Sequence, residues 1–180
     1  MFSEAENAVH SAANPITAVE VAATLQARGW LREETEGALR WMEEVRVMLG
    51  PRAANCNALA ALLRLIFDYD ARSVLAARAS QEVVCRAGAR EVIRALATEI
   101  LSRGPVDSDC LKEIVNAAMT KLPYRSREIF LPLRVVVAGC AGDGTLDRVI
   151  LLIDRAAATE GLAPVKSVRT RILEFCTSLD

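Results

Sequence analysis

The residues of this chain that could act as nucleophiles or metal ligands are five cysteines and one histidine. His10 is the only histidine, and the cysteines are widely spaced without a C-x-x-C pair: Cys56, Cys85, Cys110, Cys140 and Cys176. A structural zinc site needs four clustered thiolate or imidazole ligands, and a Cys–His or Ser–His pair needs a histidine beside the nucleophile. We therefore expect no metal, no cofactor and no histidine-based catalysis. The cysteines are interpreted as small buried apolar side chains in a reducing compartment.

The arginines are the second group of residues whose type could carry a function. Lys112, Lys121 and Lys166 are the only lysines among 22 basic residues, so the remaining basic residues are all arginines. A guanidinium presents paired donors that suit phosphates and base edges. A GC-rich genome would produce the same bias, and the net charge of −1 provides no overall attraction to nucleic acid. The arginine content alone leaves both interpretations open.

Length and composition indicate a globular protein. The chain has 180 residues, of which 52% are hydrophobic and 25% charged, enough for one domain or two small ones with their own core. Its apolar runs are much shorter than the roughly 18 residues that a membrane span needs. The N-terminus carries acids and no apolar core of a signal peptide. We expect a soluble cytoplasmic protein without a membrane partner.

The elements that must position these residues are helices, because apolar residues recur at helical spacing through most of the chain. Start and stop signals such as Asn14-Pro15, Gly29, Gly50-Pro51 and Gly161 mark their ends. The pattern predicts helices over residues 15–28, 32–49, 55 or 57 to 66, 71–78, 81–102, 109–121, 146–160 and 165–178. We therefore predict an all-α fold with an N-terminal arm (1–14) and two small helical subdomains (15–105 and 106–180), divided at Gly104-Pro105.

Residues 129–144 are ambiguous, because Val135–Val137 followed by glycines is typical of a strand that enters a phosphate-binding loop. The glycine spacing is G-x-x-G-x-G rather than G-x-G-x-x-G, no lysine follows, and no second strand pattern is present. The alternative is a short buried helix over 132–138, with Pro132 at its first position and Gly139 at its end. We favour the helix and keep the strand-and-loop alternative open.

The same segment carries a resemblance to a known family. Phe130–Arg134 followed by Gly139 resembles the F-x-P-L-R-x-x-x-x-G segment in the C-terminal, anticodon-binding half of bacterial glutamyl-tRNA synthetases. Other segments resemble that half in order and spacing: Leu62–Asp70, Gly50-Pro51-Arg52, the predicted helix 109–121, and the tail 168–179. The resemblance covers about residues 15–178. It implies a multi-helical bundle of the anticodon-binding-domain type.

The resemblance also implies a function without catalysis. The family's ATP-binding HIGH-like and KMSKS-like motifs are absent from this sequence. We therefore expect a non-catalytic module that binds tRNA, with tRNA-Glu as the first candidate, in trans with a catalytic synthetase-like protein or another tRNA-using enzyme. One alternative is a helical protein-interaction module that no longer binds RNA. The other is a C-terminal fragment of a full glutamyl-tRNA synthetase.

The resemblance implies five candidate RNA-binding residues, of which two match family positions and three fall in or near such positions. Arg52 matches an arginine that reads the third anticodon base, and Arg134 matches the P-L-R arginine that faces the anticodon loop. Asn116 falls near a position that is often basic. Thr145 and Leu146 fall in a segment that contacts the first anticodon bases. A stripe joining Arg52, Arg134 and Arg64 on one face would favour RNA binding, whereas pairing of each arginine with its own acid would favour the protein-interaction alternative.

This last segment departs from the family's pattern, which reads Thr/Ser-Pro-Gly-Leu. Here Gly144 replaces the proline, and Thr145 replaces the glycine. Asp143, directly before them, would bring negative charge toward RNA. The departure puts base recognition by this loop in question.

Overall fold

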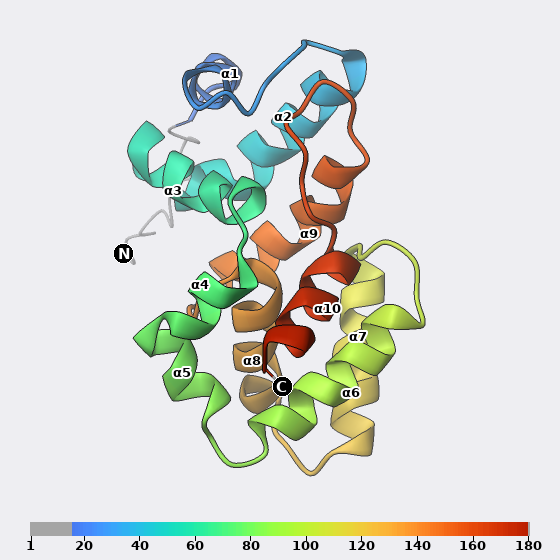
Figure 1. The fold of residues 1–180 in the computed structure, drawn as a ribbon. Coiled ribbons are helices and arrows are strands. Elements are labelled where there is room, and N and C mark those ends of the chain that lie inside the picture. The colour runs from blue at the N-terminus through green and yellow to red at the C-terminus, as the bar shows by residue number, and fades with distance from the viewer. Residues whose placement is uncertain (1–15, 180) are drawn as a thin grey trace, which may run out of the picture.

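The structure is a computed structural model and describes residues 16–179 (Figure 1). Within that range the chain is helical and forms no strand, so the all-α prediction is confirmed. The elements are α1 (Ala18–Ala27), α2 (Glu36–Leu49), the 3-10 helix η1 (Gly50–Arg52), α3 (Cys56–Phe67), α4 (Ala71–Ala76), α5 (Arg78–Val84), α6 (Ala89–Leu101), α7 (Ser108–Lys121), α8 (Ser126–Ala138), α9 (Thr145–Ala157) and α10 (Val168–Leu179). The predicted N-terminal arm, with His10 and the start signal Asn14-Pro15, lies outside the described residues.

The helices form two groups that share helix α9. Helices α1 to α3 lie at one end and α4 to α8 at the other, and α9 packs against α2, α3 and α8 (Figure 1). The last helix, α10, packs against α4, α6 and α8. Helices α6 and α7, on either side of Gly104-Pro105, also pack directly against each other. The proposed division into subdomains at this point stays a prediction.

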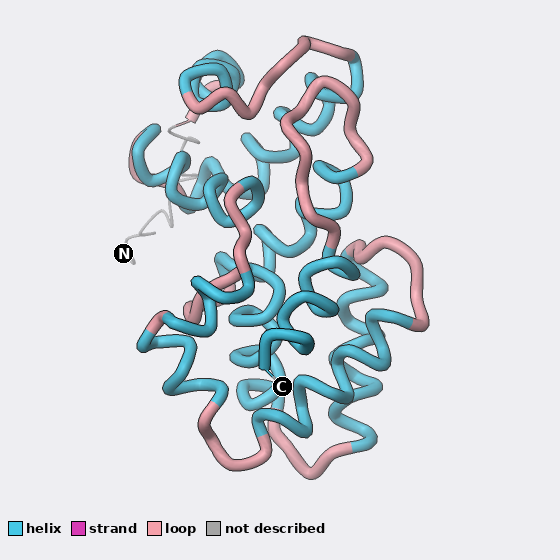
Figure 2. Tube along the Cα trace, in the orientation of Figure 1, coloured by secondary structure: helices cyan, strands magenta, loops and turns pink. Residues whose placement is uncertain are grey.

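Two long connections run side by side at the α1–α3 end, residues 28–35 and 158–167 (Figure 2). The backbone N–H groups of Arg32 and Glu33 donate to the carbonyl of Gly161 at 2.8 and 3.0 Å. The N–H of Ala163 donates to the carbonyl of Trp30 at 2.8 Å. These hydrogen bonds fix the connection before α10, which then returns to the other end of the molecule.

Helix α8 is longer than the sequence predicts and excludes the strand alternative. It begins at Ser126 rather than at Pro132, which lies inside the helix. The start is stabilised by the carboxylate of Glu128, which accepts a hydrogen bond from the backbone N–H of Arg125 at 2.8 Å. Pro132 removes one backbone hydrogen bond of the helix. The helix persists because the following Val135–Val137 segment is completely buried.

The predicted helix over 81–102 is instead two helices, α5 and α6, separated by residues 85–88. Gly88 has a φ of +79°, which breaks the helix, and a Cβ at this position would overlap the hydroxyl of Tyr124. The same break exposes Cys85, whereas the other four cysteines are half-buried, and all five are free thiols. The expectation of buried cysteines is therefore wrong for Cys85.

Arg171 of α10 is a completely buried cation that joins three helices. Its guanidinium donates to carbonyls in the last turns of α3 and α8 and to one carbonyl before α10: Leu65 at 2.9 Å, Ile66, Val137 at 2.8 Å, and Lys166 at 2.9 Å. Carbonyls at helix ends have no intrahelical donor and carry partial negative charge. Burial lowers the pKa of Arg171 to about 10, so the side chain stays protonated near neutral pH.

Tyr69 lies beside this guanidinium and extends the same junction. The Arg171 guanidinium carbon is 4.6 Å from the centre of the Tyr69 ring. The Tyr69 hydroxyl donates to the carbonyl of Val136 at 2.6 Å. Burial raises the pKa of this phenol far above its ordinary value, so it remains a neutral donor. The two side chains together fix the end of α8, from which the next loop begins.

Candidate nucleic-acid interface

The α8–α9 loop (residues 139–144) is held by Arg134, the arginine of the P-L-R segment. Its Nε and Nη2 donate to the two carboxylate oxygens of Asp147 in the first turn of α9, each at 2.7 Å. Its Nη1 donates to the carbonyl of Gly142 in the loop at 3.1 Å. The guanidinium carbon also lies 5.2 Å from the centre of the Phe130 ring. Arg134 is therefore a half-buried clamp that joins α8, the loop and α9.

Arg52, in the other half of the chain, acts on the same loop through its charge. It ends the 3-10 helix η1 and is exposed. The pKa of the Asp143 carboxyl is held below its ordinary value, mainly by hydrogen bonding to Thr145 and further by the positive charges of Arg134 and Arg52. Both arginines therefore act on one carboxylate. Within residues 16–179, Arg52 forms no ion pair.

Thr145 and Leu146 begin α9 and differ in what they present to solvent. The backbone N–H of Thr145 donates to Oδ1 of Asp143 at 2.8 Å, so this carboxylate occupies a donor at the helix start. The side chain of Leu146 is buried beneath the loop, where a Cβ on Gly142 would lie 2.7 Å from its Cδ1. Thr145 and the loop backbone are thus the accessible parts of this segment, and Leu146 supports them from below.

Asn116 and Arg64 lie on other helices. Asn116 is exposed on α7, where its carbonyl accepts a hydrogen bond from the Thr120 hydroxyl at 2.8 Å. The described interactions of Asn116 stay within its own helix and do not reach the α8–α9 loop. Arg64 is exposed on α3 and pairs with Asp68 one turn later, Nε to Oδ2 at 3.4 Å. Arg134 and Thr145 thus bind within the α8–α9 loop, Arg52 acts on it through its charge, and Asn116 and Arg64 lie elsewhere.

The arginines of the interface are balanced by acids. Arg52 and Arg134 stand against Asp143 and Asp147, so the four side chains carry no net charge. The sequence did not identify Asp147 as the partner of Arg134. The signal that could have identified Asp147 is its position in the first turn of the next helix, where the helix dipole favours acids. An arrangement of this kind recognises a ligand through directed donors more than through long-range attraction.

Other kinds of site find no support in the described part of the chain. Residues 16–179 contain no group of three or more His, Cys, Asp or Glu side chains that could hold a metal ion. Asp70, one of the acids at the end of α3, caps α4 by accepting from the N–H of Ser73 at 2.7 Å. No described helix has the length and apolarity needed to cross a bilayer.

Comparisons of the chain with protein-family models, with curated proteins and with solved structures found no match. The similarity to glutamyl-tRNA synthetases therefore rests on the order and spacing of the short segments described above.

Proposed function

We propose that the chain is a non-catalytic module that binds the anticodon arm of a tRNA, with tRNA-Glu as the first candidate. The observation that carries the proposal is that Arg134 binds the α8–α9 loop directly and that the positive charge of Arg52 also acts on this loop. These residues match two anticodon-facing arginines of the family, and their positive charges act on the same carboxylate, that of Asp143. Any aminoacylation would require a catalytic synthetase-like protein as a partner in trans.

Recognition would use the donors that the fold leaves available. Arg52 is exposed and can present its guanidinium to a base edge or a phosphate. Arg134 has five N–H donors and uses three of them within the protein, so two remain. Unpaired bases stack on arginine planes and aromatic rings, and the half-buried Phe130 lies against Arg134.

Asp143 limits the strength of such binding. Its carboxylate lies at the start of α9, the position in which a helix would otherwise accept a phosphate. An RNA backbone that approached this helix end would have to displace or avoid the carboxylate. We therefore expect moderate affinity and a small dependence on salt concentration, because few phosphates would be neutralised.

A second candidate function is a helical protein-interaction module without RNA affinity. The observation in its favour is that Arg134 and Arg64 are each paired with an acid, Asp147 and Asp68. In this alternative the arginines act in folding alone. A C-terminal fragment of a full glutamyl-tRNA synthetase would retain the interface proposed above, and the same experiment applies to it.

Direct binding to purified tRNA-Glu, tRNA-Gln and an unrelated tRNA, at low and moderate salt, tests the proposal. Arg52→Ala should weaken binding to tRNA-Glu about tenfold or more, because one bidentate base contact contributes about 1–3 kcal/mol. Arg94→Ala on α6, an exposed arginine away from the loop, is the matched control and should bind as the unmodified chain does. Asn116→Ala tests whether α7 contributes to tRNA binding, because weaker binding of this variant would show a contact at Asn116.

Binding that is absent even at low salt would overturn the RNA proposal and favour the protein-interaction alternative. Equal loss of binding in Arg52→Ala and Arg94→Ala would show that the α8–α9 loop is not the site.

A further inference from the structure

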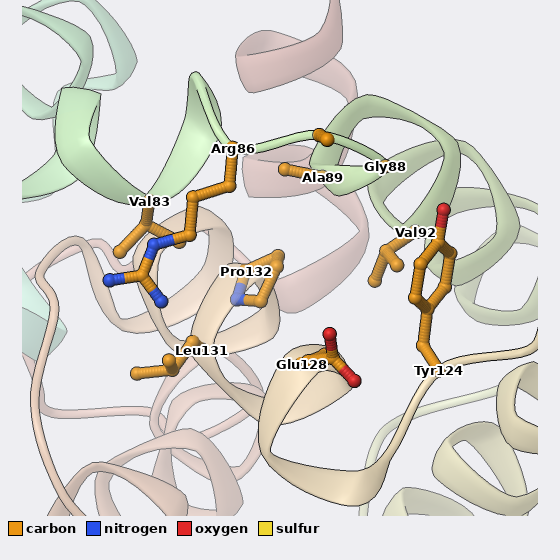
Figure 3. A pocket seen from close by; sticks show the side chains of 10 residues that line it. Val83, Arg86, Gly88, Ala89, Val92, Tyr124, Glu128, Leu131 and Pro132 are labelled. Atoms are coloured by element: carbon orange, nitrogen blue, oxygen red, sulfur yellow. The ribbon is translucent and has the colours of Figure 1, made fainter.

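A second site lies at the opposite end of α8 from the α8–α9 loop, where α5, α6 and α8 meet (Figure 3). It is a pocket of about 90 Å³ below the connections 85–88 and 122–125. Its floor is apolar and is formed by Val83, Val92, Leu131 and Pro132. Nothing in the proposed RNA interface uses this pocket.

One wall of the pocket is fixed by Tyr124. Its hydroxyl donates to Oε2 of Glu91 at 3.1 Å. The hydroxyl end of the ring fills the space that a Cβ on Gly88 would need, so the ring and the connection before α6 hold each other. The wall is therefore preorganised, and a ligand would not have to order it on binding.

Two opposite charges flank the pocket without neutralising each other. Arg86 and Glu128 lie on opposite sides of Pro132 (Figure 3). The Nε of Arg86 donates to the carbonyl of Glu82 at 3.2 Å, and Oε2 of Glu128 accepts from the N–H of Arg125 at 2.8 Å. Within residues 16–179 neither side chain takes part in an ion pair. The Nη groups of Arg86 and Oε1 of Glu128 are thus available to a ligand.

The Glu128 side of the pocket offers a carboxylate oxygen as an acceptor. The Arg86 side offers only donors.

We propose that this pocket binds a free α-amino acid with a branched aliphatic side chain, such as leucine. Its carboxylate would bind the Nη groups of Arg86, and its ammonium would bind Glu128. A cavity of ~150 Å³ holds the six carbons of benzene, so by proportion this pocket holds about four carbons, the number in an isobutyl group. The apolar floor would bury that group.

Other ligand classes satisfy only part of the pocket. A carboxylate or phosphate alone would bind Arg86 and face the unpaired Glu128. An amine alone would leave Arg86 without an acceptor. A leucine within a peptide would fill the floor but would bring neither charge. The proposal is independent of RNA binding, because the pocket and the α8–α9 loop share no residue.

The test is an NMR titration of the full ¹⁵N-labelled chain with L-leucine and three analogues. The analogues are 4-methylpentanoate, which lacks the ammonium, 3-methylbutylamine, which lacks the carboxylate, and N-acetyl-leucinamide, which lacks both charges. We expect saturable shifts of the amides of residues 86–92 and 128–133 with leucine, with a Kd on the order of 1 mM or lower. 4-methylpentanoate and 3-methylbutylamine should each bind several-fold more weakly, and N-acetyl-leucinamide about tenfold more weakly, because each lost contact is an ion pair to an exposed side chain.

Three variants keep the test specific to the pocket. Arg86→Gln and Glu128→Gln should each weaken leucine binding several-fold, because each removes one ion pair at an exposed side chain, and glutamine can replace Glu128 in capping α8. Arg90→Gln is the control, because this exposed arginine begins α6 near the pocket but does not line it. Ala87→Leu, at an exposed lining position, should abolish binding by filling the pocket, and unchanged thermal unfolding would show that the fold is intact.

The proposal is overturned if leucine produces no saturable shifts. It is equally overturned if N-acetyl-leucinamide binds as tightly as leucine, which would identify the pocket as a docking point for a peptide side chain. Unchanged leucine binding in both Arg86→Gln and Glu128→Gln would place the ligand elsewhere.

Discussion

The guanidinium of Arg134 and the carboxylate of Asp147 form a two-point ion pair between α8 and α9, with both N–O distances at 2.7 Å. The pair closes the α8–α9 loop, and the same guanidinium holds the carbonyl of Gly142. An arginine held in this way is well oriented, but its charge is neutralised. Its contribution to folding and its contribution to RNA binding can therefore be separated by changing its partner.

Asp147→Asn should raise the affinity for RNA several-fold, because it removes the negative charge paired with Arg134 while the bond to the Gly142 carbonyl keeps the guanidinium at the loop. The same change should lower the free energy of unfolding by about 1–3 kcal/mol, because it removes charge-assisted hydrogen bonds in a half-buried site. Urea denaturation and tRNA binding measured on one preparation check both effects. A loss of stability with no gain in RNA affinity would show that the pair acts in folding alone and would favour the protein-interaction alternative.

The helical fold was predictable because apolar spacing and terminal signals agree along most of the chain. Asp107, for example, caps α7 by accepting from the N–H groups of Asp109 and Cys110. The errors arose where long-range packing decides a local conformation. Nothing near Gly88 in the sequence reveals that the distant Tyr124 will fill the space of its missing Cβ. Likewise, the burial of Val135–Val137 keeps a helix intact through Pro132.

The candidate interface was predictable only in part, for a similar reason. Sequence order suggested Arg52, Arg134 and Thr145; Arg134 and Thr145 bind within the α8–α9 loop, and Arg52 acts on the loop through its charge. It did not reveal that Asp147 would accept two of the five N–H donors of Arg134. Arg171 was missed entirely, since an arginine within an amphipathic helix normally points to solvent. Its burial follows from two helix ends that converge on it from distant parts of the chain.

Arg171→Met should lower the free energy of unfolding by about 3 kcal/mol or more, because several buried carbonyls at the ends of α3 and α8 would lose their donors. The free energy of unfolding of Arg171→Lys should lie between those of Arg171→Met and the unmodified chain, since an ammonium cannot reproduce the planar fork of a guanidinium. Arg148→Met is the control, because this side chain is exposed and has no partner in the described part of the chain. Its free energy of unfolding should differ from that of the unmodified chain by no more than about 0.5 kcal/mol. Equal stability of all three variants in urea would contradict the assigned role of Arg171.

Glu99 should make stability depend on pH in the acid range. This carboxylate is buried on α6 and binds Lys121 and Arg103, whose hydrogen bonds lower its pKa below the ordinary 4.5. A lowered folded-state pKa stabilises the folded state above the unfolded-state value, and this contribution is lost as pH falls through the lowered pKa. The unfolding temperatures of the unmodified chain and of Glu99→Gln should therefore differ most near neutral pH and become equal below pH 4.5. A constant difference between the two chains across this range would show that the charge of Glu99 is not the cause.

Gly161 and Gly29 offer a matched pair that separates backbone strain from steric overlap. Both have positive φ, +88° and +69°. Alanine at either position pays about 1–2 kcal/mol for the left-handed conformation. A Cβ at Gly29 meets open space, whereas a Cβ at Gly161 would overlap the backbone carbonyl of Glu33.

Gly161→Ala should therefore be less stable than Gly29→Ala by about a further 1–3 kcal/mol, because the carbonyl of Glu33 belongs to the backbone and cannot rotate away. The overlap would also disturb the hydrogen bonds from Arg32 and Glu33 to the carbonyl of Gly161, which hold the 158–167 connection in place. Urea denaturation of both variants measures the difference. Hydrogen exchange of the Arg32 and Glu33 amides should rise in Gly161→Ala and remain slow in Gly29→Ala. Equal destabilisation with equal amide protection would mean that the connection is not clamped at Gly161.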